Sequence, residues 1–246
     1  MRVMVVLFEG FQYFCLVIIM YYELKNMNSE LLITEDGSHS LYVPEIDESY
    51  HSSHGAIQES RHIFIEAGLN KCEKSEIRVL EIGFGTGLNA FLTLIEAERS
   101  GKQIHYTSLE KYPVELEKAL QLNYPEILAP EKRIFFEQMH TSAWNEEIRI
   151  TPFFRLRKTE TDFTCYIPDN KFDVIFFDAF SPEKQPEMWT QERFETIFEH
   201  CNAGAILTTY CAKGSVRRAM QSVGFKVERL PGPPGKREIL RGRKAI

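Results

Sequence analysis

Three acidic residues occur where runs of strand-forming residues end, at Glu81, Glu110 and Asp178. Glu81 precedes a loop with three glycines, and a helical pattern follows that loop directly. Glycines have no Cβ, so the backbone of such a loop can approach a ligand closely. An acid beside the loop can pair with an ammonium group, and the start of the following helix favours a carboxylate. These residues predict a site for a small ligand at the end of a first strand.

The spacing of the glycines separates two classes of cofactor. The segment VLEIGFGTGLN (79–89) has the spacing G-x-G-x-G, whereas a dinucleotide-binding loop needs G-x-G-x-x-G, and position 88 is Leu. The pattern acid-x-G-x-G-x-G resembles motif I of the class I S-adenosylmethionine-dependent methyltransferases. That resemblance implies that Glu81 helps to anchor the ammonium end of the cofactor, directly or through water. Glu110 ends the next strand, where its carboxylate can accept both ribose hydroxyls.

Asp162 has two interpretations. It follows FFRLRKTET, where it can accept from the amino group of the adenine, but an acid in a surface loop is the simpler explanation. With it, the residues predicted to bind the cofactor are Glu81, Gly83, Gly85, Gly87, Asn89, Glu110 and Asp162.

The elements that position these residues alternate between strands and helices from residue 77 onward. Alternating strands and helices predict an α/β fold with a mostly parallel, twisted sheet flanked by helices, as in the Rossmann-like class I methyltransferases. The predicted strands are 77–83, 104–110, 172–178 and 205–211, and the predicted helices are 88–100, 114–122 and 190–201.

Three further segments interrupt this alternation. Residues 31–68 form an N-terminal extension whose helical stretch, HGAIQESRHIFIEAG, is expected to fold back over the sheet. Residues 133–170 are expected to form a hairpin-like insertion, with RIFFEQ and FFRLRKTE as strands and a turn at Pro152. The C-terminal strands are expected to pair across the Pro/Gly loop 231–235.

Several of these motifs together resemble one family. VLEIGFGTGLN, SLEKYP, FFDAFSPEKQPEMW, GSVRRAMQSVGF and GKREILRG occur in the same order as in the methyltransferase domain of the bacterial tRNA 5-methylaminomethyl-2-thiouridine biosynthesis protein. The resemblance covers about residues 31–244. It implies methylation of the exocyclic amine of 5-aminomethyl-(2-thio)uridine at wobble position 34, and closure of the stretch from Tyr50 to Glu59 over the cofactor or the acceptor pocket.

The better-known members of that family carry a second, FAD-dependent oxidase domain, which first removes a carboxymethyl group. This chain ends at Ile246 without such a domain, so it resembles a stand-alone methyltransferase. The origin of its aminomethyl-uridine substrate is therefore open.

Asp178 is the predicted catalytic residue. It ends the fourth strand at the carboxyl edge of the sheet, where ligands of open α/β folds bind. An aspartate with an ordinary pKa near 3.9 is a weak base, so we expect it to hold and orient the acceptor amine, with proton acceptance secondary. The alternative is that Asp178 only caps the next turn. Phe180 and Pro182 are expected to wall the space beside it.

The expected RNA contacts follow from charge and from aromatic residues. Between Lys213 and Lys244 there are ten Lys/Arg and two Asp/Glu, a balance of +8, which leaves −14 for the rest of a chain whose net charge is −6. A basic face of this kind either meets phosphates or is merely solvated. Trp189 is as well explained by the core as by base stacking. The residues predicted to contact substrate are Phe180, Pro182, Tyr210, Lys213, Arg217, Arg218, Lys236 and Arg237.

The cysteines, the histidines and the apolar N-terminal run argue against several other classes of protein. Five cysteines without a C-x-x-C pair argue against a zinc site or a disulfide framework and fit a reducing cytoplasm. His51, His54 and His62 lack a metal-binding spacing, so no metal is expected. The apolar run 11–22 is too short to span a membrane comfortably. We expect residues 1–27 to be a poorly packed or non-native leader and 28–246 to be a single methyltransferase domain.

Two alternative functions remain open. One is a methyltransferase of small amines or of another nucleic acid, which would have no use for the basic face. The other is a non-catalytic RNA-binding module that keeps the fold and binds the cofactor without turnover.

Overall fold

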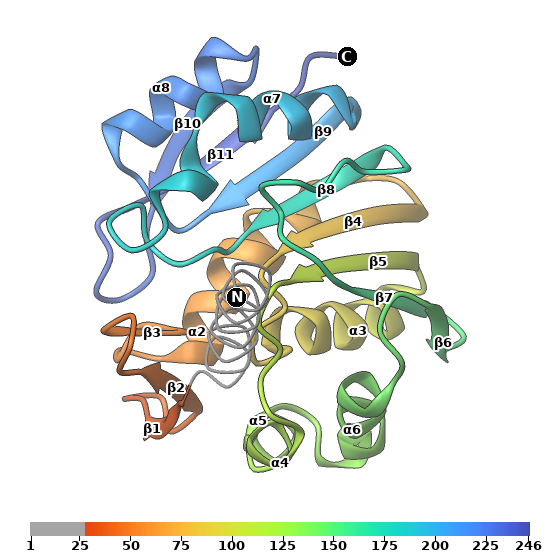
Figure 1. The fold of residues 1–246 in the computed structure, drawn as a ribbon. Helices are drawn as coiled ribbons and strands as arrows, with labels where there is room; N and C mark the ends of the chain where they lie inside the picture. The colour runs from red at the N-terminus through yellow and green to blue at the C-terminus, as the bar shows by residue number, and fades with distance from the viewer. Residues whose placement is uncertain (1–27) are drawn as a thin grey trace, which may run out of the picture.

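The computed structural model describes residues 28–246, which form an eight-stranded mixed sheet with helices on both faces (Figure 1). The strand order is β10-β11-β9-β8-β4-β5-β7-β6. The five strands from β9 to β7 run parallel, and the three outer strands β6, β11 and β10 pair antiparallel with their neighbours. The strands are β4 (Glu76–Ile82), β5 (Gln103–Glu110), β6 (Glu147–Thr151), β7 (Phe154–Glu160), β8 (Phe172–Phe177), β9 (Cys201–Thr209), β10 (Lys226–Pro231) and β11 (Glu238–Arg243).

The centre of the sheet is buried on both sides. Every residue of β8 is buried, because its side chains alternate between two helical layers. Phe176 packs in the core formed with α3 (Leu88–Ser100), whereas Phe177 packs in the core formed with α7 (Gln191–Glu199) and α8 (Gly214–Ser222). The predicted α/β architecture with a mostly parallel sheet is confirmed.

The N-terminal extension contributes a small antiparallel sheet and a helical segment. The small sheet consists of β1 (Glu30–Ile33), β2 (His39–Val43) and β3 (Glu48–Ser49). The helical segment comprises α2 (Ala56–Ser60), the π-helical turn η1 (Arg61–Glu66) and the 3₁₀ turn η2 (Leu69–Lys71). The ring of Phe64 lies 5.2 Å from that of Phe176, so this segment folds back over the sheet as expected.

The prediction of a hairpin-like insertion over residues 133–170 was wrong in part. RIFFEQ lies in a helix, α6 (Arg133–Thr141), because Phe136 and Met139 recur at helical spacing and both are buried. The hairpin with Pro152 in its turn does exist, but its strands are β6 and β7. Since β7 pairs in parallel with β5, it belongs to the main sheet and is not an insertion. The helical elements before β6 are α4 (Leu116–Ala119), α5 (Tyr124–Leu128), the 3₁₀ turn η3 (Pro130–Lys132) and α6.

The C-terminal strands β10 and β11 pair antiparallel, as expected from the Pro/Gly loop between them. Within residues 28–246, no helix has both the length and the apolar character that a membrane crossing requires. The predicted leader, residues 1–27, lies outside the part of the chain that the structure describes.

Candidate functional site

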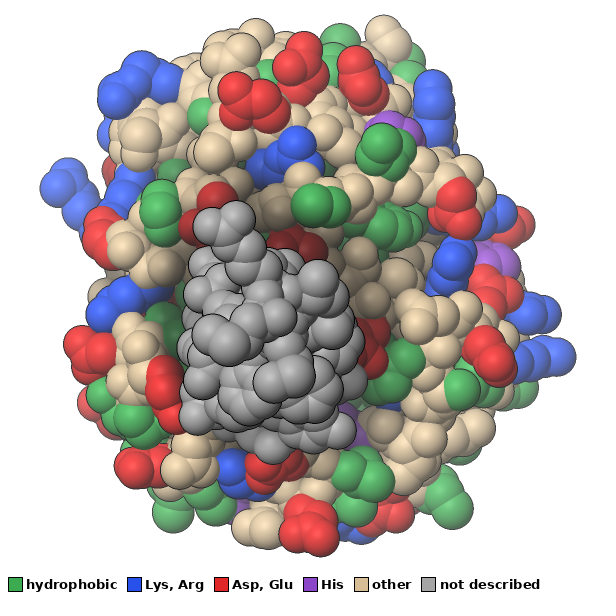
Figure 2. Space-filling view, viewed as in Figure 1, with side chains coloured by type: hydrophobic (Ala, Val, Ile, Leu, Met, Phe, Trp, Pro, Cys, Tyr) green, Lys and Arg blue, Asp and Glu red, His purple; other side chains and the backbone are tan. Residues whose placement is uncertain are grey.

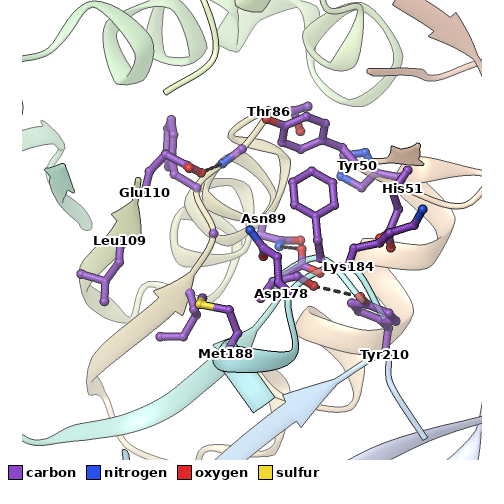
Figure 3. A pocket seen from close by; sticks show the side chains of 18 of the residues that line it. Tyr50, His51, Thr86, Asn89, Leu109, Glu110, Asp178, Lys184, Met188 and Tyr210 are labelled. Atoms are coloured by element: carbon purple, nitrogen blue, oxygen red, sulfur yellow. Dashed lines mark hydrogen bonds between the residues drawn. The ribbon is translucent and has the colours of Figure 1, made fainter. Parts of the chain in front are cut away.

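A pocket of about 510 Å³ lies at the carboxyl ends of the parallel strands (Figure 3). Its walls come from the segments that follow β4, β5, β7 and β8, together with residues of the N-terminal extension. β4 lies between β5 and β8, so the chain leaves β4 toward one side of the sheet for β5 and reaches β8 on the other side. Open α/β sheets bind ligands at such a switch point, beyond the carboxyl ends of the strands.

The glycine loop after β4 forms one wall of this pocket. Gly83 has φ +95, and a Cβ at this position would lie 2.6 Å from the backbone oxygen of Asp178. Gly85 has φ +48, and its added Cβ would lie 2.8 Å from the ring of Tyr50. Both positions combine a left-handed backbone with a close approach, so both require glycine. The third glycine, Gly87, is the left-handed residue from which α3 begins.

Glu110 lies at the end of β5, beside this loop, as predicted. Its Oε2 accepts the Gly85 N–H at 2.9 Å, and its Oε1 accepts the Tyr112 N–H at 2.9 Å. Burial raises the pKa of Glu110, and these backbone hydrogen bonds oppose the shift. The two amides fix the plane of a carboxylate whose remaining lone pairs can accept from a ligand.

Glu81 is not part of the pocket wall. The residue is 1% exposed, and its Oε2 accepts from the hydroxyl of Ser108 on the neighbouring strand β5 at 2.5 Å. Burial raises the pKa of Glu81 to about 8. The expected contact between Glu81 and a ligand ammonium is therefore not a direct one in this arrangement. Asn89, the second residue of α3, does line the pocket.

Asn89 connects this region to the predicted catalytic residue. Its Nδ2 donates to Asp178 Oδ2 at 2.8 Å (Figure 3). Burial raises the pKa of Asp178 to about 7. The sequence-based expectation of an ordinary, weakly basic aspartate was thus wrong, because it took no account of desolvation at this edge of the sheet. A pKa raised toward neutrality suits Asp178 to accept a proton near pH 7.

Asp162 lies in the pocket wall after β7. Its carboxylate is 2.8 Å from the Lys111 ammonium and accepts the Thr164 N–H at 2.8 Å. Burial raises the pKa of Asp162, but Lys111 and Thr164 outweigh burial and leave the pKa below its ordinary value. It is accordingly an ionised acceptor at the rim of the pocket, and it also organises its own turn.

Aromatic residues form the wall on the Asp178 side. Phe180 packs edge-on against Tyr50, with ring centroids 5.2 Å apart. The Tyr210 hydroxyl donates to the Ala179 carbonyl at 2.8 Å. Tyr50, Phe180 and Tyr210 all line the pocket. Sequence reasoning expected the segment around Tyr50 only as a cover, and its ring contact with Phe180 had no signal in the sequence.

Two residues of the FFDAFSPEKQPEMW motif lie outside this wall. Pro182 does not line the pocket among the described residues and instead belongs to the loop behind it. Trp189 is 6% exposed and packs on Phe177, with centroids 4.7 Å apart. Its indole N–H donates to the Phe180 carbonyl at 2.8 Å. Trp189 therefore belongs to the core, where it supports the backbone of Phe180.

The basic residues divide into two groups. Lys236 lines the pocket and lies 3.2 Å from Glu59. The other predicted contacts lie outside the pocket: Lys213 pairs with Glu183, and Arg217 and Arg218 are on α8. Figure 2 shows basic side chains on the surface at the upper left, where α8 and β10 lie in Figure 1. Arg237 is exposed in the loop before β11.

Within residues 28–246, no three His, Cys, Asp or Glu side chains lie close enough together to hold a metal ion. His51 lines the pocket, and burial lowers its pKa to about 4, so it is neutral at pH 7. Its Nδ1 lies 3.2 Å from the Ser40 hydroxyl.

Comparison with known proteins links this site to a family. The chain is 34% identical over 214 residues to the tRNA 5-methylaminomethyl-2-thiouridine biosynthesis bifunctional protein MnmC of Pseudomonas fluorescens, and this match covers 80% of the chain. It is 32% identical over 233 residues to the MnmC of Marinomonas sp., covering 85% of the chain. The chain spans about a third (32%) of the length of each of these relatives.

The fold has solved counterparts. The crystal structure of MNMC2 from Aquifex aeolicus superposes with a TM-score of 0.72 at 29% identity, over 89% of this chain and 72% of that one. A spermidine synthase from Thermotoga maritima shares the fold alone, with a TM-score of 0.54 at 14% identity, over 89% of this chain and 73% of that one.

The family itself is matched over more than half of the chain. Residues 113–245 match a family described as S-adenosyl-L-methionine-dependent methyltransferase. This segment begins just after Glu110 and contains Asp178, and the glycine loop that the sequence identified as motif I precedes it. The chain therefore belongs to the S-adenosyl-L-methionine-dependent methyltransferases.

Proposed function

We propose that the chain methylates the exocyclic amine of 5-aminomethyl-(2-thio)uridine at wobble position 34 of tRNA and so produces 5-methylaminomethyl-(2-thio)uridine. The observation that carries this proposal is Asp178, a half-buried carboxyl whose pKa desolvation raises to about 7, in a pocket wall that also presents Phe180 and Tyr210. A carboxyl of this kind suits an amine acceptor, and aromatic walls suit an extruded base. The names of the MnmC relatives support the same substrate.

The residues of the glycine-loop wall fit S-adenosylmethionine. Glu110 presents a carboxylate that backbone amides already orient. Asn89, which also lines the pocket, has a buried Oδ1 without a partner in the described residues. We assign Glu110 to the ribose, the start of α3 to the carboxylate of the methionine part, and Asp162 to the adenine edge. When bound, this cofactor supplies a methyl group activated on a positively charged sulfur.

Asp178 prepares the acceptor. A free alkyl amine with a pKa near that of lysine, about 10.4, requires roughly 4.6 kcal/mol to be neutral at pH 7. An apolar wall lowers that cost by disfavouring the ammonium form. Asp178, held by Asn89 at 2.8 Å, accepts an N–H of the amine and fixes its direction. Its pKa of about 7 also lets it take the proton that the nitrogen loses.

The tRNA contacts extend from the pocket over the basic face. Phe180 and Tyr210 provide surfaces beside the target base, in line with the recognition of unpaired RNA bases by stacking. We assign Lys213, Arg217, Arg218 and Arg237, which lie outside the pocket, to the phosphates of the anticodon arm. A tRNA substrate places the reaction in the cytoplasm.

The test is mass spectrometry of wobble nucleosides from cells that lack the gene. We expect 5-aminomethyl-uridines to accumulate and the methylated form to return when the wild-type gene is restored, but not when Asp178→Asn is restored. An unchanged nucleoside profile would refute the proposal. Cofactor binding by the purified chain without turnover on any tRNA would favour a non-catalytic RNA-binding module, and turnover of free amines alone would favour a small-molecule enzyme.

A further inference from the structure

Lys236 differs from the other basic residues of the C-terminal segment because it reaches into the pocket. The loop that connects β10 to β11 folds back toward the N-terminal extension, and Lys236 lines the same pocket as Asp178 and Tyr210. Its Nζ lies 3.2 Å from Glu59 Oε1 and 4.7 Å from the centre of the Tyr210 ring. A long cationic side chain that serves phosphate binding usually points into solvent, and this one does not.

The position of this ammonium group is fixed from both sides. Glu59 is itself buried, and its Oε2 accepts the Ser52 N–H at 2.7 Å. The loop is closed by the Lys236 N–H, which donates to the Pro233 carbonyl at 2.9 Å. The His62 ring lies 2.8 Å from the Pro231 carbonyl at the start of the loop. The side chain of Lys236 is 27% exposed, so the ammonium group is held at the pocket wall before any substrate arrives.

The chemistry of the target base gives this group a partner. In 5-aminomethyluracil the aminomethyl group is on C5, and the neighbouring ring atom carries the O4 carbonyl. The amine and O4 are therefore neighbours on the base. If Asp178 holds the amine, a hydrogen-bond donor close to Asp178 is also close to O4. Lys236 and Asp178 line the same pocket, and the charge of Lys236 lowers the pKa of the Asp178 carboxyl against the effect of desolvation. An ammonium group has three N–H donors, so Lys236 can keep its bond to Glu59 and still donate to the base.

On the basis of the proposed function, we propose that Lys236 donates a hydrogen bond to O4 of the target base and thereby selects uridine over cytidine. Cytosine carries an amino group at the equivalent position, which is itself a donor. A fixed ammonium group next to that amino group leaves two donors facing each other without an acceptor. Lys236 is thus a specificity residue of the acceptor pocket and not part of the phosphate-binding face.

The test uses two anticodon stem-loop RNAs that carry 5-aminomethyluridine or 5-aminomethylcytidine at position 34. For the wild-type protein, kcat/KM on the uridine substrate exceeds that on the cytidine substrate by about 10- to 100-fold, the range of one good base-edge contact. Lys236→Met lowers kcat/KM on uridine by a similar factor and brings the ratio close to one. Arg237→Met, a change at the exposed neighbour, weakens RNA binding and reduces its salt dependence but keeps the ratio.

A folding control separates a lost contact from a lost structure. Lys236→Met leaves the buried Glu59 carboxylate without its cation, so the double variant Glu59→Gln/Lys236→Met is measured beside it. The double variant is expected to fold with a normal unfolding midpoint and to show the same loss of discrimination. A uridine preference that persists in both variants would overturn the proposal. Absence of wild-type turnover on the uridine substrate would instead refute the proposed function and this inference with it.

Discussion

Replacement of Asp178 by asparagine is predicted to abolish methylation and to stabilise the folded protein at alkaline pH. The amide side chain keeps the size of the carboxyl and an acceptor oxygen for Asn89, but it cannot accept a proton. Loss of general-base function typically costs about 10²- to 10⁴-fold in rate. Because the change lies on the acceptor side, the variant should still bind S-adenosylmethionine.

The gain in stability follows from the burial of the carboxyl. The pKa of Asp178 rises from its ordinary 3.8 to about 7 in the folded protein. The unfolded chain is ionised above pH 3.8, whereas the folded chain holds the proton up to about pH 7, so ionisation weakens the fold progressively across this window. The penalty is complete above pH 7 and amounts to roughly 4 kcal/mol at 1.36 kcal/mol per pKa unit. It is absent in the variant.

Urea unfolding at two pH values and single-turnover methylation measure both effects. Relative to wild type, the variant should gain roughly 2 to 3 kcal/mol in free energy of unfolding between about pH 5 and about pH 8. Methylation that stays near the wild-type rate with unchanged folding would end the catalytic assignment. A variant that is less stable than wild type at both pH values would identify Asp178 as a structural cap of its turn.

Three further predictions concern the cofactor wall and the basic face. Binding of the cationic cofactor at pH 7 should release protons from the carboxyls of the pocket, because a nearby positive charge lowers their pKa. Calorimetry in buffers of different ionisation enthalpy measures this proton release, and Asp178→Asn should reduce the number of protons released. Arg217→Ala and Arg218→Ala should each reduce the slope of log K against log salt for tRNA binding by about 0.7, and an unchanged slope would remove α8 from the RNA interface. Gly83→Ala should abolish cofactor binding, because its Cβ would lie 2.6 Å from a backbone oxygen; Gly101→Ala, with a similar positive φ but nothing within 4 Å, is the matched control and should retain binding.

The cofactor wall could be predicted from sequence because it depends on local order. The carboxyl ends of adjacent parallel strands meet at one edge of a sheet, so the acid at the end of β5 had to lie near the glycine loop after β4. Glu110 and Gly85 are accordingly in hydrogen-bond contact. Helix α3 begins at Leu88 and ends at Ser100, as the apolar pattern predicted.

Other features depend on tertiary contacts that no local pattern records. RIFFEQ is a short apolar run that fits a strand or a helix, and its packing against α3 decides for a helix. The basicity of Asp178 comes from burial by segments distant in the sequence. Lys236 and Arg237 are neighbours of the same charge, yet one lines the pocket and the other faces solvent. Only the course of the loop distinguishes them.

The two walls of the pocket also differ in when they can form during synthesis. The glycine loop and Glu110 are joined by contacts about 25 residues apart, so this wall can assemble soon after it leaves the ribosome. The contact between Glu59 and Lys236 joins elements from the two ends of the described chain, and such long-range closures come late. The glycine loop and Glu110 can thus meet well before the wall that selects the base is complete. Base selectivity is then the last property of the pocket to be acquired.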